Sequence, residues 1–278
     1  MLCNSGQALA FEALKTQIRL DGRSGLEYRD IKITFPGLIG QSLVSFGSTI
    51  VLCTVNGEVI PPVDSRPTEG FYHFHVEIGS LTTVGFEPGK PTEQEMFICS
   101  TIEHLLRDSG TIETESLCIV SGKYVWSIRV DMLVLEDAGN ALDACALSAV
   151  ASTMHFKRQQ VKIDGEKIEL LSLDHFTPGE LFIHHIPIFV TFAIVDDFIM
   201  IDPSTMEEML ADTLISVAVN QFEQICKIQK IGGKEISLEQ LDRVLQVSKQ
   251  QFNHVYGVLK KSMELDKEAR QWVLANIK

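Results

Sequence analysis

The order of strand-type and helix-type segments constrains the fold of this chain most, because the same order occurs twice. In the first half, four segments alternate apolar and polar side chains, as strands with one buried face do. They cover residues 31–35, 42–46, 49–55 and 71–78. A helix follows, with Thr92 as its expected N-cap and Glu95 completing a capping box, and Ser109-Gly110 ends it.

The second half repeats strands followed by a helix. Its strand-type segments cover residues 117–121, 126–135, 161–170, 186–195, 198–201, 214–220 and 224–231. Residues 141–154 are rich in Ala, Leu and Val, which indicates a buried helix, and a long helical tract starts at Ser237. Residues 6–20 carry apolar side chains at helical spacing and predict a short N-terminal helix.

These segments predict one α+β domain. No Gly/Ser-rich linker separates the halves, and each half has too few elements to cover its own sheet, so we expect one bilobed core. An apolar content of 45% excludes a disordered chain. The chain has no run of about 18 uncharged apolar residues, as a membrane span requires, and residues 1–10 do not resemble a secretory signal. We therefore expect an intracellular protein.

Net charge restricts the possible partners. The chain has 24 basic and 37 acidic residues, a formal net charge of −13. Proteins that bind nucleic acid alone usually present a basic face, since phosphate neutralisation supplies most of the binding energy. The charge favours a subunit that works beside a more basic partner over a free-standing nucleic-acid binder. The six cysteines form no Cys-x-x-Cys pair, and we interpret them as reduced, buried, small hydrophobes rather than a redox or metal site.

Two groups of side chains have the composition of metal sites. His73 and His75 lie two apart on a predicted strand, so both imidazoles face the same way and could bind zinc. Hydrogen-bonded histidines on a half-buried strand are the favoured interpretation. His184 and His185 occupy adjacent strand positions and point to opposite faces, which makes them a poorer pair. A stand-alone metal hydrolase built on His73 and His75 stays open as one hypothesis.

The second group is acidic and comprises Asp196, Asp197, Asp202, Glu207, Glu208 and Asp212. Carboxylates gathered between two strands can hold Mg²⁺ for phosphoryl chemistry. However, Ser204-x-x-Glu207 and Thr205-x-x-Glu208 both match the capping box, and Asp202-Pro203 fits a turn or helix start. A capped turn is therefore the favoured interpretation. The nucleophile motif Gly-x-Ser-x-Gly and the phosphate loop Gly-x-x-x-x-Gly-Lys-Ser/Thr are both missing from the sequence.

Three basic residues lie at predicted loops or a helix end. Arg66 is in a Pro-rich loop, Lys90 is in the loop 85–91, and Arg107 is close to the end of the helix before Ser109. They are candidates to converge on a phosphate path, because cations near loops position nucleic-acid backbones. For any one of them, a solvated surface charge is the alternative.

Several stretches resemble the RNase PH-like subunits of the eukaryotic RNA exosome. They are Arg19-Leu20-Asp21-Gly22-Arg23 with Tyr28-Arg29, Thr68-Glu69-Gly70, Gly85-Phe86-Glu87-Pro88-Gly89, Leu106-Arg107-Asp108-Ser109, Ile112-Glu113-Thr114-Glu115-Ser116-Leu117-Cys118, Val125-Trp126-Ser127-Ile128-Arg129-Val130-Asp131, Gly139-Asn140-Ala141-Leu142-Asp143-Ala144, His184-His185-Ile186-Pro187 and Ile201-Asp202-Pro203. The match runs in order from about Arg19 to Glu264, nearly the whole chain.

The resemblance implies an α+β RNase PH fold of the ribosomal protein S5 domain 2-like type, with two β-β-α-type halves. The implied division is an N-terminal helix or extension over 1–18, an RNase PH-like domain over 19–264 with halves of about 19–154 and 155–264, and a helical tail over 265–278. It also implies a hetero-hexameric ring with other RNase PH-like subunits, RNA-binding cap subunits, associated nucleases and single-stranded RNA. Neither a membrane nor DNA is an expected partner, and the expected location is the nucleus and nucleolus, and also the cytoplasm.

Active members of this family hold inorganic phosphate with a Gly-Thr-Arg-like loop and keep a catalytic aspartate after a Glu-Asp pair. On this chain the loop falls on Asn140-Ala141-Leu142, with Leu142 in place of the arginine. The acidic pair falls on Glu207-Glu208, and the aspartate position falls near Leu214. A leucine offers phosphate no charged donors, and the loss of one such donor costs roughly 3–4 kcal/mol of transition-state stabilisation.

The resemblance and these departures together predict a non-catalytic, structural and RNA-guiding ring subunit without catalytic residues, metal or cofactor. An active phosphate-dependent 3'-to-5' exoribonuclease is the alternative. For RNA contact we expect Arg107 first and then Lys90 and Arg66, because Arg107 lies in the stretch that resembles the pore-facing helix of the family's RNA-guiding subunits.

Overall fold

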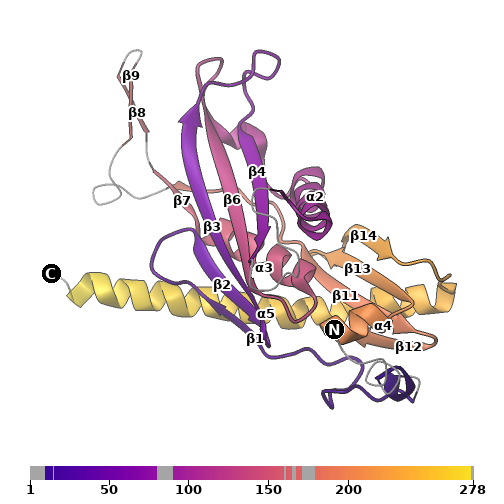
Figure 1. The fold of residues 1–278 in the computed structure, drawn as a ribbon. Coiled ribbons are helices and arrows are strands. Elements are labelled where there is room, and N and C mark those ends of the chain that lie inside the picture. Colours follow the sequence, from indigo (N-terminus) through magenta and orange to yellow (C-terminus); the bar gives the residue numbers. More distant parts are fainter. Residues whose placement is uncertain are drawn as a thin grey trace.

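Two β-sheets lie side by side in the computed structural model, and one long helix runs along both (Figure 1). The structure describes residues 10–14, 16–79, 90–159, 161–164, 167–170 and 179–276. The long helix is α5 (Leu238–Asn276), which contacts β1 of the first sheet and β11 and β13 of the second. It therefore connects the two halves of the chain along one side.

The first sheet has the strand order β1-β2-β3-β6-β4, with β5 paired to β6. Its strands are β1 (Ile31–Thr34), β2 (Gln41–Phe46), β3 (Thr49–Ile60), β4 (Phe71–Ile78), β5 (Cys118–Val120) and β6 (Tyr124–Glu136). All pairs are antiparallel except β4 with β6, which is parallel. Burial alternates along β2 and most of β3, so one face of the sheet packs against helices and the other does not.

The second sheet has the order β12-β11-β13-β14 and is antiparallel throughout. Its strands are β11 (Ile188–Val195), β12 (Phe198–Ile201), β13 (Thr213–Val219) and β14 (Ile225–Ile231). All eight residues of β11 are buried, because α5 packs on the sheet and apolar residues of the N-terminal segment, including Leu14, contact Ala193 and Val195. The continuous apolar sequence of β11 is the pattern of a strand covered on both faces.

Helix α3 (Ala141–His155) is the centre of the molecule. All its residues except Met154 are buried, and it contacts β2, β3 and β6 of the first sheet and β11 of the second. Its small Ala and Ser side chains allow this close packing against two sheets. One cluster of buried apolar residues extends through both halves, which confirms the predicted bilobed α+β domain with a shared core.

The remaining elements are short, apart from α2. They are α2 (Glu93–Asp108), η1 (Thr114–Leu117), β7 (Lys157–Arg158), β8 (Val161–Asp164), β9 (Lys167–Leu170), β10 (Gly179–Glu180) and α4 (Thr205–Leu210). Helix α2 packs on β4. The predicted capping box of α2 is confirmed, since the Glu95 backbone N–H donates to Thr92 Oγ1 at 3.2 Å and Thr92 N donates to the Glu95 carboxylate at 2.6 Å.

Two local predictions are wrong. The helix predicted over 6–20 is helical over 10–14 in the described residues, and Gln17 adopts a left-handed conformation with φ 61° in the turn that follows. His184 and His185 lie in the loop before β11 rather than on a strand. Residues 85–89 of the loop expected at 85–91, and the hairpin turn at Gly165, lie outside the described residues.

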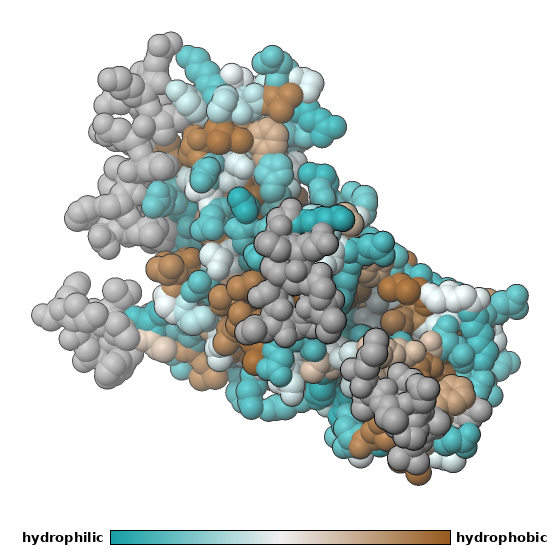
Figure 2. Space-filling model, viewed as in Figure 1, coloured by the Kyte–Doolittle hydropathy of each residue, from teal (hydrophilic) through white to brown (hydrophobic). Residues whose placement is uncertain are grey.

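Two further observations concern the described cysteines and the described helices. Five cysteines are free, of which Cys53 and Cys145 are buried and Cys99, Cys118 and Cys226 are half-buried. None of the described helices is long and apolar enough to cross a membrane. Side chains of both kinds, hydrophilic and hydrophobic, are interspersed over the face in Figure 2.

Candidate functional site

The first candidate site is the N-terminal end of α3, where the family resemblance puts the phosphate loop. Asn140 is the N-cap residue and has a left-handed backbone with φ 57°. Leu142 is only 8% exposed and belongs to the shared core. Leu214, at the aspartate position, packs on the cluster that contains Ala193 and Met200. Both leucines therefore pack in apolar surroundings, and their side chains offer an anion neither a positive charge nor a hydrogen-bond donor.

Glycine at position 139 brings α4 onto this end of α3. Gly139 has φ +97°, and a Cβ there would collide with the backbone of Ser204 and Thr205. The Thr205 backbone N–H donates to the Ala138 carbonyl at 3.2 Å. Only glycine permits this approach of two backbones in a left-handed conformation. As a result, the carboxylates of the segment 202–208 lie next to Asn140.

Three carboxylates hold Asn140. Its backbone N–H donates to Glu208 Oε1 at 2.7 Å, and its side-chain Nδ2 donates to Asp202 Oδ1 at 2.9 Å and to Asp143 Oδ2 at 3.1 Å. The N-terminal end of a helix favours an anion, because its N–H groups and dipole are positive there. In this chain its own carboxylates take that place. An inorganic phosphate would meet negative charge at this point.

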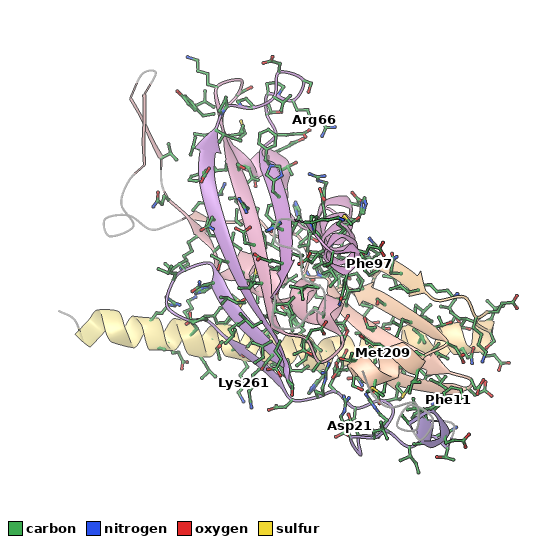
Figure 3. The ribbon with its side chains drawn as sticks, viewed as in Figure 1. Phe11, Asp21, Arg66, Phe97, Met209 and Lys261 are labelled. Carbon is green, nitrogen blue, oxygen red and sulfur yellow. The ribbon has the colours of Figure 1, made fainter. Side chains whose placement is uncertain are left out.

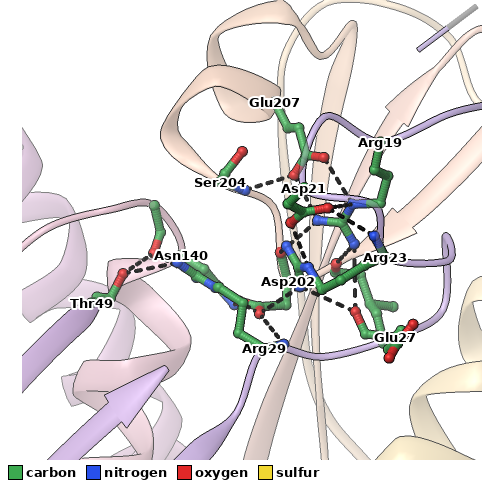
Figure 4. Close-up of polar contacts among 12 residues, drawn as sticks. Arg19, Asp21, Arg23, Glu27, Arg29, Thr49, Asn140, Asp202, Ser204 and Glu207 are labelled. Carbon is green, nitrogen blue, oxygen red and sulfur yellow. Dashed lines mark hydrogen bonds and ion pairs between the residues drawn. The ribbon is translucent and has the colours of Figure 1, made fainter. Parts of the chain in front are cut away.

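Arg29 neutralises Asp202 with a two-pronged ion pair (Figure 4). Its Nε lies 2.8 Å from Asp202 Oδ2 and its Nη2 lies 2.7 Å from Oδ1, and the Asp202 side chain is fully buried. The same guanidinium donates to the carbonyls of Ala138 and Gly139 at 3.1 and 3.0 Å. Arg29 therefore links the start of β1 to the loop before α3 and to the turn before α4.

Arg19 and Arg23 extend this network to the N-terminal segment. Arg19, whose side chain is 0% exposed, donates to the two Glu207 oxygens at 2.8 and 2.6 Å and to the Ile201 carbonyl at 2.9 Å. Arg23 donates to Asp202 Oδ2 at 3.1 Å and to Asp21 at 2.5 Å. Each of these three arginines is thus committed to a carboxylate of the chain itself. The motif around residues 19–29 fastens the N-terminal segment to the second half.

The three carboxylates around Asn140 differ in pKa, although burial acts on all of them. Burial disfavours the charge of Asp202, but the hydrogen bonds and charge of Arg29 outweigh it, so the pKa of Asp202 is lowered. Among the described residues no arginine hydrogen-bonds to Glu208, and burial raises its pKa to about 7 despite the hydrogen bond from Asn140 N and the charge of Arg29. Burial likewise raises the pKa of Asp143 to about 6, against the hydrogen bonds from Thr191 and Asn140. Near neutral pH the site therefore holds carboxylates that are partly protonated.

The predicted acidic group is split in two by the structure. Asp202 and Glu207 belong to the arginine network, and Glu208 lies beside it on Asn140. Asp196 and Asp212 bind Lys234 at 2.7 and 2.8 Å, and Asp197 accepts from Gln240 at 3.3 Å. The capping box of Ser204 and Glu207 is confirmed, while Glu208 reaches Asn140 instead of capping the residues before it.

The two predicted histidines do not complete a metal site in the described structure. His73 and His75 are exposed on β4. Within the described ranges, no three His, Cys, Asp or Glu side chains are arranged to hold a metal ion. His184 lies 3.8 Å from Glu113 through Nε2, and His185 binds the hydroxyls of Ser109 and Thr111. Hydrogen bonding and surface exposure account for these four imidazoles.

The residues predicted to contact RNA are separated from one another. Arg107 is in the last turn of α2 and pairs with Glu103 at 2.7 Å. Arg66 lies in the loop between β3 and β4 (Figure 3) and pairs with Glu69 at 3.1 Å. Lys90 is exposed just before α2 begins. The 16 residues of α2 span about 24 Å, so Lys90 and Arg107 are far apart. RNA contact by these three residues stays a prediction.

Sequence reasoning missed the arginine network and the position of Glu208. Arg19 and Asp202 are 183 residues apart, and no local pattern relates them. The sequence offered one signal for this network. Residues 19–29 contain three arginines, and a dense acidic group occurs elsewhere in a chain that has few other cations.

Comparisons with known proteins agree with the observed fold. A model of the 3' exoribonuclease family, domain 1, matches residues 27–159, and the model of domain 2 of that family matches residues 185–251. The chain is 38% identical over 272 residues to the Danio rerio protein called Exosome complex component RRP45, covering 97% of this chain and 69% of the relative. It is 34% identical to the Homo sapiens protein of that name, covering 97% of this chain and 62% of the relative.

Solved structures are similar over the same extent. The Archaeoglobus fulgidus exosome with RNA bound to the active site contains a chain that is 27% identical, with a TM-score of 0.79, covering 91% of this chain and 97% of that chain. An archaeal exosome core contains a chain that is 25% identical, with a TM-score of 0.74, covering 94% of this chain and 97% of that chain. The expected RNase PH fold is thereby confirmed. The chain spans less than two thirds of the human relative's length.

Proposed function

This chain belongs to the 3' exoribonuclease family, and from that premise we propose that it is a non-catalytic subunit of an exosome core ring. In this role it braces neighbouring RNase PH-like subunits and guides RNA, while associated nucleases process and degrade the RNA from its 3' end. The relatives named as exosome components and the exosome structures of the same fold support a place in such a ring.

The observation that carries the non-catalytic part is the closed N-terminal end of α3. Phosphorolysis needs cations that hold a phosphate dianion at the reacting bond. Here Glu208, Asp202 and Asp143 occupy the surroundings of Asn140, Leu142 is buried, and Arg19, Arg23 and Arg29 are bound to the chain's own carboxylates. A phosphate ion would have to displace buried ion pairs, at a cost of several kcal/mol.

We further propose the specific ring position. Residues 184–187 and 224–233 most resemble exosome component nine of the PM/Scl autoantigen type, and several relatives carry the name RRP45. The proposed partners are the other RNase PH-like subunits of a hetero-hexamer, the RNA-binding cap subunits, associated nucleases and single-stranded RNA. The proposed location is the nucleus and nucleolus, and also the cytoplasm.

Co-expression tests the ring proposal. The chain is produced alone and together with the RNase PH-like subunits of its own organism, and both preparations are examined by size-exclusion chromatography and native mass spectrometry. An obligate ring interface buries about 2,000 Å² or more of mainly apolar surface, so the isolated chain should self-associate and co-expression should give a defined hetero-oligomer. A stable monomer whose melting temperature is unchanged by the neighbours would contradict the proposal.

A further inference from the structure

A recess lies between the C-terminal end of α2, the loop before β11 and the turn from β13 to β14. Its volume is about 400 Å³, which is large enough for a nucleoside-sized ligand. It is lined by Ser109, His184, His185, Asn220, Phe222, Gln224, Ile225 and Cys226. In a chain with 61 Asp, Glu, Lys and Arg residues, the described lining contains none of them, so the recess suits an uncharged group.

Phe222 is the aromatic residue in the lining of this recess, and it is 65% exposed. The turn that carries it is fixed by Asn220, which is 3% exposed. Asn220 Oδ1 accepts from the backbone N–H groups of Phe222 at 3.0 Å and Gln224 at 2.9 Å, and Asn220 Nδ2 donates to Gln224 Oε1 at 3.1 Å. Glu223 adopts φ 59° to complete the turn. An aromatic ring held outward by a rigid turn loses little conformational entropy when a ligand stacks on it.

The opposite wall is also fixed and offers hydrogen-bonding groups. His185 Nε2 lies 3.1 Å from Ser109 Oγ and 3.2 Å from Thr111 Oγ1. Burial lowers the pKa of His185 and so favours its neutral imidazole, in which Nε2 contacts these two hydroxyls and Nδ1 is the second hydrogen-bonding atom. Beside it, the Gln221 side-chain amide accepts from Ile186 N at 2.7 Å, which holds the loop of the two histidines against the turn.

A flat ring with neutral donors and acceptors at its edge matches this arrangement. We propose that the recess binds one unpaired nucleobase of single-stranded RNA, stacked on Phe222 and hydrogen-bonded by the groups around His185 and Gln224. Proteins that bind single-stranded RNA commonly stack bases on exposed aromatic rings. The lining has no Lys or Arg for a phosphate, and Arg107, whose side chain is half exposed in the last turn of α2, is a cation close in sequence to Ser109.

The inference rests on the proposed function, because a threaded RNA supplies the unpaired base. Apolar residues also reach the surface along the neighbouring edge strand β14, namely Ile225, Ile228 and Ile231. A protein partner that covers Phe222 is therefore the competing occupant. The absence of Asp, Glu, Lys and Arg from the described lining and its hydrogen-bonding walls favour a base over an apolar side chain.

The test uses the co-expressed ring with a single-stranded oligouridylate that contains 4-thiouridine. After photo-crosslinking, mass spectrometry maps the attached peptides. Crosslinks at residues 220–226 are expected in the wild type, with about a 5- to 100-fold loss in Phe222→Ala and retention in Phe222→Trp, which keeps a stacking surface. Phe182→Ala is the matched control, since Phe182 is 64% exposed and does not line the recess.

Two readouts separate the possible failures. Crosslinking that is unchanged in Phe222→Ala in a properly assembled ring overturns the inference alone. Hydroxyl-radical labelling of Phe222 gives the second readout, measured without RNA before and after ring assembly. If assembly alone protects Phe222, a protein partner occupies the recess and the inference is overturned. Failure of the chain to assemble with its neighbours overturns the proposed function and this inference with it.

Discussion

Replacing Arg29 by methionine should be among the most damaging single changes outside the apolar core. Methionine keeps an unbranched apolar side chain and removes the guanidinium, which leaves the fully buried Asp202 without its two-pronged partner. Breaking a buried ion pair from one side costs about 3–5 kcal/mol. For a chain of this length that corresponds to a fall in melting temperature of about 6–20 °C.

The measurement is urea unfolding followed by the fluorescence of the buried Trp126, together with a thermal melt. The matched control is Arg66→Met, whose ion pair with Glu69 is 72% and 37% exposed and should contribute less than about 1 kcal/mol. The double variant Arg29→Met with Asp202→Asn should be less destabilised than the sum of its two single variants. Equal effects of Arg29→Met and Arg66→Met would refute the argument that the arginine network holds the halves together.

Three further predictions concern the same regions. Gly139→Ala should destabilise the chain by about 2–4 kcal/mol in urea unfolding, because the Cβ collides with the backbone of α4 at a positive φ, whereas an equally stable variant would contradict that packing. Glu208 has a raised pKa of about 7, so its stabilising protonated form is lost as pH rises through that value. Glu208→Gln keeps the acceptor for Asn140 N and should gain about 2–3 kcal/mol relative to the wild type between pH 5 and pH 8, and a pH-independent difference would argue against a buried, ionising Glu208. Arg107→Glu should weaken RNA threading by the assembled ring without changing its assembly, as measured by fluorescence anisotropy and native mass, and loss of assembly would mean that Arg107 is structural.

Much of the fold could be predicted because its signals are local. The capping box at Thr92, the alternation in β2 and the small, apolar composition of α3 each depend on residues close in sequence, and the structure has these elements within one or two residues of the expected bounds. The continuous apolar run of β11 likewise matches burial on both faces. Periodicity is informative wherever one element packs in one way along its whole length.

The N-terminal segment shows where local signals fail. Apolar spacing predicted a helix over residues 6–20 and gave no sign that Arg19 is buried. Instead Ile18 and Leu20 are 60% and 55% exposed and Arg19 is buried, because its ion pair with Glu207 forms across the molecule. Helical periodicity carries no information about a partner 188 residues away. The contact of Glu208 with Asn140 was missed for the same reason. The sequence pattern Thr205-x-x-Glu208 predicted that Glu208 caps a helix, whereas it accepts a hydrogen bond from the Asn140 backbone.

A phosphorolysis assay tests most directly the central claim that this chain does not cleave RNA with inorganic phosphate. The purified chain, alone and in its ring, is incubated with poly(A), Mg²⁺ and phosphate, and release of adenosine diphosphate is followed by chromatography. With its own carboxylates around Asn140 and its three arginines already paired, the chain alone should release no more diphosphate than a buffer blank, and Asn140 and Glu208 variants should leave any activity of the ring unchanged. Phosphate-dependent release by the chain alone, lost on changing Asn140, would contradict the account.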